Sequence, residues 1–324
     1  MSTIPDALRG RPFTTAEAEA LGVSRKRLRG SAFQLLHPGH GVWSTADTPQ
    51  TLEFLLAADR LVLPPDAAVS HVTGLRLYLP KDLRDLPLTP RHWSTNSPAQ
   101  RRTAKIVLHR RQSRLHPRHL EPIPLLGPDR CLVDAAISLS LAEIVQVGDA
   151  LIRAGHTSPE VFNTFAWGRS LHGVRRSRQS GWRMREKAGS FTETQARLAM
   201  SICGLPDPEV NGPIHTSGRA QPWHGDLVLR PWRIVVEYDG WHHERSAGQR
   251  RVDIVRRESI EAEGWLVVVL TAEDLRSVPT LVGRVWRALV KRGYDGRPPV
   301  YSRADLEELH RHPKAARPLS PHLL

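Results

Sequence analysis

The sequence has few cysteines, fewer acidic than basic residues, and no long apolar run. Its two cysteines, Cys131 and Cys203, stand far apart and lack the close spacing of a zinc cluster. We therefore expect no disulfide framework and a reducing compartment. No apolar stretch approaches the roughly 20 residues of a membrane span, and residues 1–10 lack the apolar core of a signal peptide. Together these absences predict a soluble, cytoplasmic protein without a membrane partner.

Acidic residues are outnumbered, since 33 Asp and Glu stand against 46 Lys and Arg, giving a formal net charge of +13. An excess of this size favours nucleic acid or another anionic surface as the partner. Lysine is also scarce, because almost all of the basic residues are Arg. Arg binds phosphate and guanine edges bidentately. GC-rich codon usage explains the Arg share equally well, but it does not explain the net charge. With 324 residues, the chain is long enough for two or three domains.

Acidic residues end one of the strand-like segments within residues 225–270. Short runs of Val, Ile and Leu bounded by Gly and polar turns are typical of buried strands. Glu237 and Asp239 are two positions apart, so on a strand they point to the same side. Asp226 lies on the preceding strand and can stand beside them. Three such acids repel one another unless a cation lies between them, and oxygen ligands suit Mg²⁺ or Mn²⁺.

This pattern resembles the core of the PD-(D/E)XK endonucleases, and in particular their very-short-patch-repair-like branch. The resemblance rests on the run at 236–245, the Arg-rich segment 249–257 and the strand at 264–271, which opens with Gly-Trp. It implies a restriction-endonuclease-like α/β domain at 190–297, with a mixed sheet flanked by helices. It also implies metal-dependent hydrolysis of phosphodiester bonds. Asp239 departs from the family pattern, because most of these enzymes carry a Lys at that place.

The site residues follow from this resemblance and from the strand pattern. We assign Asp226 and Glu237 as metal ligands, and Asp239 as a third ligand or a group that orients water. His243 lies just past the strand end, where an imidazole can donate a proton or contact the scissile phosphate. Glu193 has two readings: a helix cap, or the helix carboxylate that reaches the metal in the resembled family. The adjacent His242 and His243 could suggest zinc instead, but no third soft ligand stands near them at a suitable spacing, so zinc is disfavoured.

Residues 1–45 read as a DNA-binding unit. A capping-box spacing between Thr14 and Glu17 opens a helix, and a turn, a short basic helix and a hairpin follow. This layout resembles the winged helix-turn-helix of AbiEi-type antitoxins, which implies that the second helix enters the major groove. It also implies a cognate toxin or a second copy of the chain as a possible partner besides DNA. The residues expected to contact DNA are Arg25, Lys26, Arg27 and Arg29, together with Arg250, Arg251 and Arg256 from the C-terminal domain.

The remaining segments carry weaker signals. Residues 46–155 are expected to form a small α+β module, to which the antitoxin resemblance extends weakly, with helices at 51–63 and 67–75. Residues 156–189 read as a basic linker or a short helix that tracks phosphates, and residues 298–324 as a polar tail. The middle module holds four residues that could form a site but are better explained by capping and core hydrogen bonds: His71, Asp129, Arg130 and Asp134.

Two functions from different classes fit these features. The first is a DNA-binding protein with a metal-dependent endonuclease domain. The second is an antitoxin-like transcriptional regulator whose nuclease fold is inactive. The two differ at Asp226 and Glu237, because only an active nuclease depends on these carboxylates.

Overall fold

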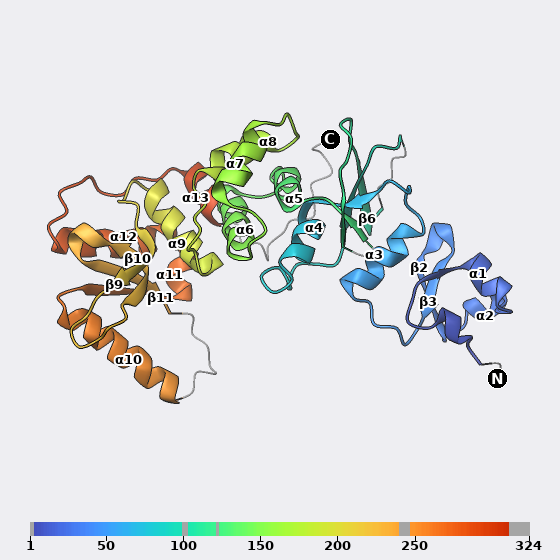
Figure 1. The fold of residues 1–324 in the computed structure, drawn as a ribbon, viewed down its shortest axis with the longest axis horizontal. Coiled ribbons are helices and arrows are strands. Elements are labelled where there is room, and N and C mark those ends of the chain that lie inside the picture. The colour runs from blue at the N-terminus through green and yellow to red at the C-terminus, as the bar shows by residue number, and fades with distance from the viewer. Residues whose placement is uncertain (1–2, 99–102, 121–122, 240–246, 311–324) are drawn as a thin grey trace. The chain divides into compact units, whose positions relative to one another are not determined.

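The computed structural model describes residues 3–98, 103–120, 123–239 and 247–310. The chain forms two compact units. The first comprises Met1–Gly74 and Pro87–Cys131, and the second Leu75–Leu86 and Leu132–Leu324. Both combine helices with β-sheets, as expected for an α/β protein (Figure 1). No helix within these described ranges is long and apolar enough to cross a membrane.

The first unit begins with the expected order of helix, turn, basic helix and hairpin. Its elements are η1 (Asp6–Leu8), β1 (Phe13–Thr14), α1 (Thr15–Ala20), α2 (Arg25–Leu28), β2 (Phe33–His37), η2 (Pro38–His40) and β3 (Val42–Thr45). The strands form an antiparallel sheet in the order β1-β3-β2. Local chemistry sets the helix starts, because Thr14 and Glu17 form a complete capping box and the Ser24 side chain caps α2. The core beneath them consists of Leu8, Phe13, Ala18, Val23, Leu28 and Phe33.

A five-stranded mixed sheet fills the rest of this unit. Its elements are α3 (Leu52–Arg60), β4 (Ala68–Val69), α4 (His71–Tyr78), β5 (Arg91–Thr95), β6 (Ile106–Arg110), β7 (Arg118–Leu120), β8 (Ile123–Leu125) and α5 (Pro128–Ala135), and α4 and α5 cross into the second unit. The strand order is β6-β5-β4-β8-β7. The helix predicted over 67–75 is therefore wrong in its first part. Ala68 and Val69 instead form a fully buried strand between β5 and β8.

A buried carboxylate joins the hairpin to this sheet. Asp59 of α3 accepts hydrogen bonds from Arg91 Nε (2.6 Å) and Nη2 (2.7 Å) and from Trp93 Nε1 (3.0 Å). Its Oδ1 also lies 3.0 Å from His37 Nε2, at the end of β2. All four side chains are buried. The winged segment thus keeps its own core but is also joined to α3, since Leu36 and Val42 pack with residues of that helix. Both parts belong to the same compact unit.

The second unit carries a four-stranded mixed sheet. Its elements are α6 (Leu141–Arg153), α7 (Pro159–Trp167), α8 (Val174–Gly181), α9 (Phe191–Ile202), β9 (Glu209–Ile214), β10 (Trp223–Leu229), η3 (Arg230–Trp232), β11 (Ile234–Tyr238), α10 (Ala247–Ala262), β12 (Leu266–Leu270), α11 (Ala272–Arg276), α12 (Val278–Lys291) and α13 (Arg303–His310). The strand order is β12-β11-β10-β9, in which β11 and β12 are parallel and the other pairs antiparallel.

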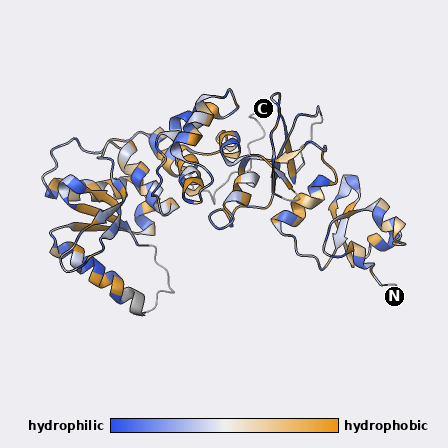
Figure 2. Cartoon of the chain, in the orientation of Figure 1, coloured by the Kyte–Doolittle hydropathy of each residue, from blue (hydrophilic) through white to orange (hydrophobic). Residues whose placement is uncertain are grey.

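Apolar strands explain how this sheet is covered. Residues of β10, β11 and β12 are mostly hydrophobic (Figure 2), as expected for strands with both faces covered. Val228 and Val235 of neighbouring strands pack on Ile260 of α10. Figure 1 shows α10 on the opposite side of the sheet from α9 and α12. The face that carries Val228 and Val235 is therefore the α10 face.

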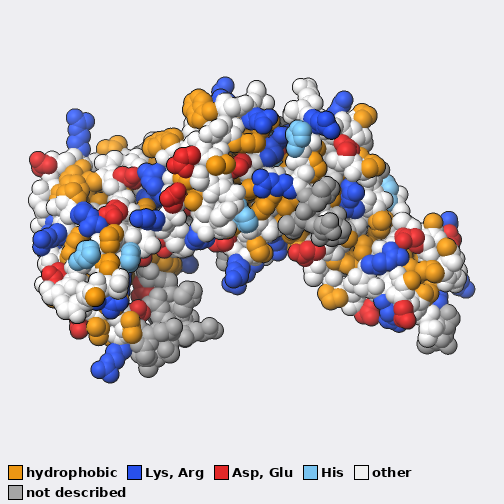
Figure 3. Space-filling view, viewed as in Figure 1, with side chains coloured by type: hydrophobic (Ala, Val, Ile, Leu, Met, Phe, Trp, Pro, Cys, Tyr) orange, Lys and Arg blue, Asp and Glu red, His pale blue; other side chains and the backbone are white. Residues whose placement is uncertain are grey.

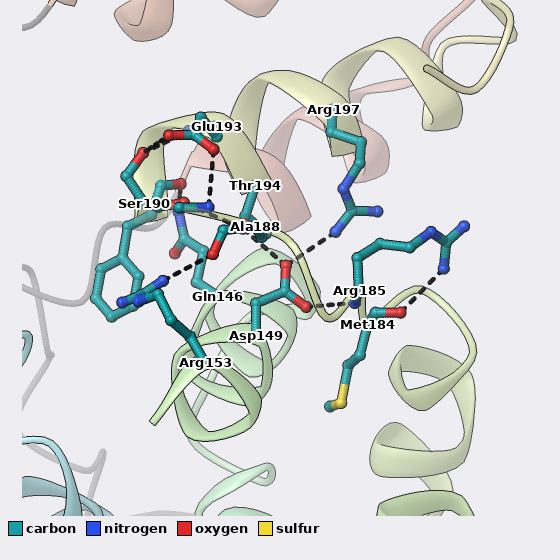
Figure 4. A network of polar contacts seen from close by, with 12 residues as sticks. Gln146, Asp149, Arg153, Met184, Arg185, Ala188, Ser190, Glu193, Thr194 and Arg197 are labelled. Atoms are coloured by element: carbon teal, nitrogen blue, oxygen red, sulfur yellow. Dashed lines mark hydrogen bonds and ion pairs between the residues drawn. The ribbon is translucent and has the colours of Figure 1, made fainter. Parts of the chain in front are cut away.

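A buried ion pair fastens α9 to α6 (Figure 4). Asp149 of α6 accepts hydrogen bonds from Arg197 Nη2 (3.0 Å), Thr194 Oγ1 (2.7 Å) and the backbone N–H of Arg185 (2.8 Å). Both Asp149 and Arg197 are almost completely buried. These bonds hold the first turns of α9 in place, and with them the Glu193 side chain.

Two segments are more ordered than the sequence suggested. Residues 156–189 contain α7 and α8, which bury Phe162, Ala166, Ser177 and Ser180, so this segment is not an open linker. Its small residues let the helices pack closely. The polar tail contains α13, where the Glu308 carboxylate accepts hydrogen bonds from Arg176 (2.8 Å) and the N–H of Leu141 (2.6 Å). Residues 311–324 lie outside the described part.

Candidate functional site

Asp226 and Glu237 stand next to each other on antiparallel strands. Leu227 of β10 pairs with Val236 of β11, so Asp226 and Glu237 occupy the adjoining register position. The N–H of Tyr238 donates a hydrogen bond to Asp226 Oδ2 at 3.0 Å. Alternation from Val228 and Val235 places both carboxylates on the α10 face of the sheet. The predicted neighbourhood of these two acids is therefore present.

Arg256 of α10 contacts this pair. Its Nη1 lies 2.6 Å from Glu237 Oε1, and the two side chains are only 20% and 13% exposed. The guanidinium also donates to the backbone carbonyl of His224. The sequence predicted Arg256 as a phosphate contact, whereas in the structure its guanidinium neutralises Glu237. Arg251 is exposed on the same helix, while the side chain of Arg250 and all of His243 lie outside the described residues.

Glu193 forms the expected helix cap, and its other expected role, as a carboxylate that reaches a metal, stays a prediction. Its carboxylate accepts hydrogen bonds from the N–H of Gly189 (2.8 Å) and from Ser190 Oγ (3.0 Å), which is a cap at the start of α9 (Figure 4). It also lies close enough to Asp226 for their charges to interact, because burial and the charge of Asp226 raise the pKa of Glu193. The cap thus holds a third carboxylate near Asp226.

Burial raises the pKa of all three acids. For Asp226, the hydrogen bond from Tyr238 and the charge of Arg256 offset part of the rise in pKa. For Glu237, burial raises the pKa, Arg256 lowers it, and the Asp226 charge raises it again. Each carboxylate is thus costly to keep charged in this position. A cation between them would remove part of that cost.

Asp239 follows β11 and is exposed, and its N–H donates to the Leu270 carbonyl at 2.9 Å. Strand alternation keeps it on the Glu237 side, although the adjoining residues 240–246 are not described. The acids do not form a closed ligand shell. In the described part of the chain, the group whose ligand atoms all lie within 4.8 Å of one another is instead His71, His92 and His109.

This histidine group was missed by the sequence reasoning, which assigned His71 to core hydrogen bonding. His71 does make such bonds, to Ser70 Oγ (2.8 Å) and Arg111 Nη2 (3.0 Å). Burial, then His109, His92 and Arg111, hold the pKa of His71 well below its ordinary value. His92 and His109 lie on two strands whose pairing the sequence alone does not reveal. The one available signal was a histidine in each of two strand-like segments.

The residues of α2 that were predicted to read DNA are mostly exposed. Arg25, Lys26 and Arg29 are exposed at α2, and Arg27 is partly covered. Arg25 pairs with Glu19 at 2.8 Å, and both side chains are exposed. Figure 3 shows basic side chains scattered over the visible face, with acidic ones between them. A single large basic patch is therefore not evident on that face.

Exposed tryptophans are a second feature that the sequence reasoning passed over. Trp167 is 67% and Trp182 58% exposed. The guanidinium of Arg178 lies 4.9 Å from the Trp167 ring centroid, and that of Arg183 lies 3.8 Å from the Trp182 ring centroid. Aromatic rings next to Arg are typical of surfaces on which nucleic-acid bases stack.

Comparison with known proteins gives relatives but no function. Two curated sequences, each from a different strain of Mycobacterium tuberculosis and each described as an uncharacterised protein, are 28% identical to this chain over 165 residues. The match covers 50% of this chain and 60% of each relative, so the chain spans about three-fifths of their length. No protein-family model matches the sequence, and no solved structure matches it.

Proposed function

We propose that this chain binds DNA and hydrolyses phosphodiester bonds with a metal-dependent endonuclease domain of the PD-(D/E)XK type. The observation that carries the proposal is the pairing of Asp226 and Glu237 on two adjacent strands, with Glu193 of α9 close enough to Asp226 for their charges to interact, and with the pKa of each acid raised by burial. Buried acids with perturbed pKa values cluster at functional sites.

The arrangement of elements supports a restriction-endonuclease-like fold. A helix precedes the strands, β10 and β11 run antiparallel, and α10 connects the parallel strands β11 and β12. In this layout a carboxylate from the helix approaches two carboxylates from the strands. This is the set of elements that the resembled nucleases use.

The residues fit a hard divalent ion by donor type. Asp226 and Glu237, with Glu193 nearby, offer only carboxylate oxygens, which suit Mg²⁺ or Mn²⁺. Such an ion, when bound, polarises the phosphate and activates a water. Arg256 already lies beside Glu237 and can turn its guanidinium to a phosphate instead, since guanidinium binds carboxylate and phosphate in the same way. Asp239, at the strand end, orients water or completes the ligand set.

The first unit supplies the DNA reader in this proposal. The exposed basic residues of α2 lie on the helix that enters the major groove in winged helix-turn-helix proteins. The exposed side chains of Arg25, Lys26 and Arg29 can reach bases or phosphates there. In the second unit, the exposed rings of Trp167 and Trp182 offer a separate surface for unpaired bases.

Cleavage assays with plasmid and single-stranded DNA in Mg²⁺ or Mn²⁺ test the proposal. Asp226→Ala should lower the rate by about 100-fold or more, because the metal and the water are then misplaced together. Glu261→Ala removes an exposed acid from α10 and should leave the rate unchanged. If wild type and Asp226→Ala behave alike on every substrate, and calorimetry detects no Mg²⁺ or Mn²⁺ binding, the nuclease assignment is overturned.

A second candidate is an antitoxin-like DNA-binding regulator with an inactive nuclease fold. Arg256 favours it, because its ion pair neutralises Glu237 without a metal. The acid at Asp239, in place of the usual Lys, favours it as well. This candidate predicts tight, sequence-selective DNA binding that survives Asp226→Ala, with no metal-dependent cleavage by the wild type.

A further inference from the structure

A second cluster of metal-binding side chains lies in the first unit, apart from the acidic site. Its members come from the start of α4 (His71), from β5 (His92) and from β6 (His109). In the parallel pairing of β5 with β6, Ser94 lies opposite His109, so His92 and His109 project to the same side one step apart. The ring centroids of His71 and His109 are 3.8 Å apart, and each lies 5.3 Å from that of His92.

The rings of His71 and His109 are stacked, with an angle of 19° between their planes, and ring nitrogens of His92 and His109 face each other. His92 Nδ1 and His109 Nε2 are 3.0 Å apart. One imidazole nitrogen of each of the three residues lies within 4.8 Å of the other two. Two imidazole nitrogens at hydrogen-bond distance share a single proton. An ion can take the place of that proton, if the proton moves to the opposite nitrogen of its own ring.

Surrounding residues hold the His71 ring and the backbone of His92 in position. Ser70 Oγ lies 2.8 Å from His71 Nδ1 and accepts a hydrogen bond from Ser94 Oγ at 2.9 Å. Thr73 Oγ1 accepts the N–H of His92 at 2.9 Å. His71 has a backbone φ of +52°, a left-handed conformation that residues other than Gly seldom adopt. Outer hydrogen bonds of this kind orient the histidines of metal sites.

We propose that His71, His92 and His109 bind a divalent first-row transition ion of the zinc class, each through one ring nitrogen. Imidazole is a preferred ligand of such ions and not of Mg²⁺, which takes oxygen. The Ser70 contact at Nδ1 leaves Nε2 of His71 for the ion. Three histidines leave a fourth position for water or an anion, as in zinc sites with an open position.

Arg111 adds a specific consequence. Its Nη2 lies 3.0 Å from His71 Nε2, the nitrogen assigned to the ion. The guanidinium must give up this contact when the ion binds, because both cannot occupy the same lone pair. It then stands beside the open coordination position. A positive side chain there favours an anion, such as phosphate or carboxylate, as the fourth ligand.

Titration calorimetry of the full-length, metal-free protein with Zn²⁺ tests the proposal, together with absorption spectra of the Co²⁺ form. We expect one strong site with nitrogen-ligand d–d bands and no comparable uptake of Mg²⁺ by the histidines. His92→Ala and His109→Ala should each weaken Zn²⁺ binding by more than the roughly 10–100-fold caused by loss of an outer hydrogen-bond partner. His116→Ala, an exposed histidine of the same unit, should have no effect.

Two further variants separate this site from the acidic one and from a folding defect. Asp226→Ala should leave the Co²⁺ bands unchanged, whatever it does to cleavage. Arg111→Gln keeps all three histidines and should bind Zn²⁺ at least as tightly as the wild type, because a competing cation is gone. Any of three results would overturn the assignment. These are Zn²⁺ binding that is weaker in Arg111→Gln than in the wild type, a wild type without a Zn²⁺ site, and Co²⁺ bands that are unchanged in His109→Ala.

Discussion

Arg256 Nη1 and Glu237 Oε1 lie 2.6 Å apart at the edge of a buried carboxylate cluster. In this position the guanidinium does what a metal ion would do, since it neutralises an acid that burial makes costly to charge. Under the proposed function, Arg256 and a divalent ion would therefore compete for the same carboxylate. The ion pair between Arg256 and Glu237 would therefore weaken the apparent affinity of this site for the metal.

Arg256→Gln should raise the affinity for Mn²⁺ by roughly tenfold, since a hydrogen bond to a charged group is worth about 1.5–3 kcal/mol. Arg251→Gln on the exposed side of the same helix is the matched control and should have no effect. Calorimetry at near-neutral pH measures both. Equal affinities in the two variants would show that Arg256 does not compete with the ion.

Asp226 should make the stability of the metal-free protein depend on pH. Burial raises the pKa of its carboxyl in the folded state. The folded state then binds the proton more tightly than the unfolded chain, and protonation stabilises the fold. The stabilisation of the fold by this proton is complete below the ordinary pKa of an Asp carboxyl. It is lost as the pH rises through the raised pKa of Asp226 in the folded state.

Asp226→Asn keeps an acceptor for the Tyr238 N–H but carries no charge. The free energy of unfolding of Asp226→Asn, minus that of the wild type, should therefore increase as the pH rises from the ordinary carboxyl pKa to the raised pKa of Asp226. Above that raised pKa the difference should stay constant. Urea unfolding in the presence of a chelator, at a series of pH values, measures the difference. A difference that stays constant with pH would contradict the assigned burial.

Asp149 should be critical for the stability of the second unit. It is buried, and its removal leaves the buried charge of Arg197 uncompensated. Asp149→Ala should lower the free energy of unfolding by about 3–5 kcal/mol. Glu307→Ala breaks the exposed pair with Arg303 and should cost at most about 1 kcal/mol. Replacing both Asp149 and Arg197 with Leu should cost less than Asp149→Ala alone, and urea unfolding ranks all three.

Arg25 and Lys26 should contribute phosphate or base contacts. Replacing both with Ala should reduce the slope of log K against log salt by about two, if both contact phosphates. Arg303→Ala is the matched control, since Arg25 and Arg303 both form exposed pairs with a Glu. Fluorescence anisotropy with duplex DNA at several salt concentrations gives the slopes. An unchanged slope in the double variant would exclude α2 from the phosphate contacts.

Sequence reasoning succeeded where the cause was local. The capping spacing at Thr14 and Ser190 fixed two helix starts. Strand alternation put Asp226 and Glu237 on one face. It did not foresee contacts between distant segments, because helical periodicity cannot show that the side chain of Arg256 lies against Glu237.

Composition was misleading in other places. Glycines and arginines left residues 156–189 open between a basic linker and a short helix, and the structure has the helices α7 and α8 there, packed through small buried residues. Ala68 and Val69 read as helix, but pairing with two strands made them part of a sheet. The histidine cluster depends on the parallel pairing of β5 with β6, which no local pattern reveals.

The strand β5 serves two structures at once, because its side chains alternate. On one face, Arg91 and Trp93 bind Asp59, which also contacts His37 of the hairpin. On the other face, His92 and Ser94 point to the histidine cluster. Inserting one residue into this strand would exchange the two sets, placing a guanidinium among the imidazoles and an imidazole against Asp59. The spacing within these five residues is thus a shared constraint, and the strand can change in evolution only by replacing residues, never by changing its length.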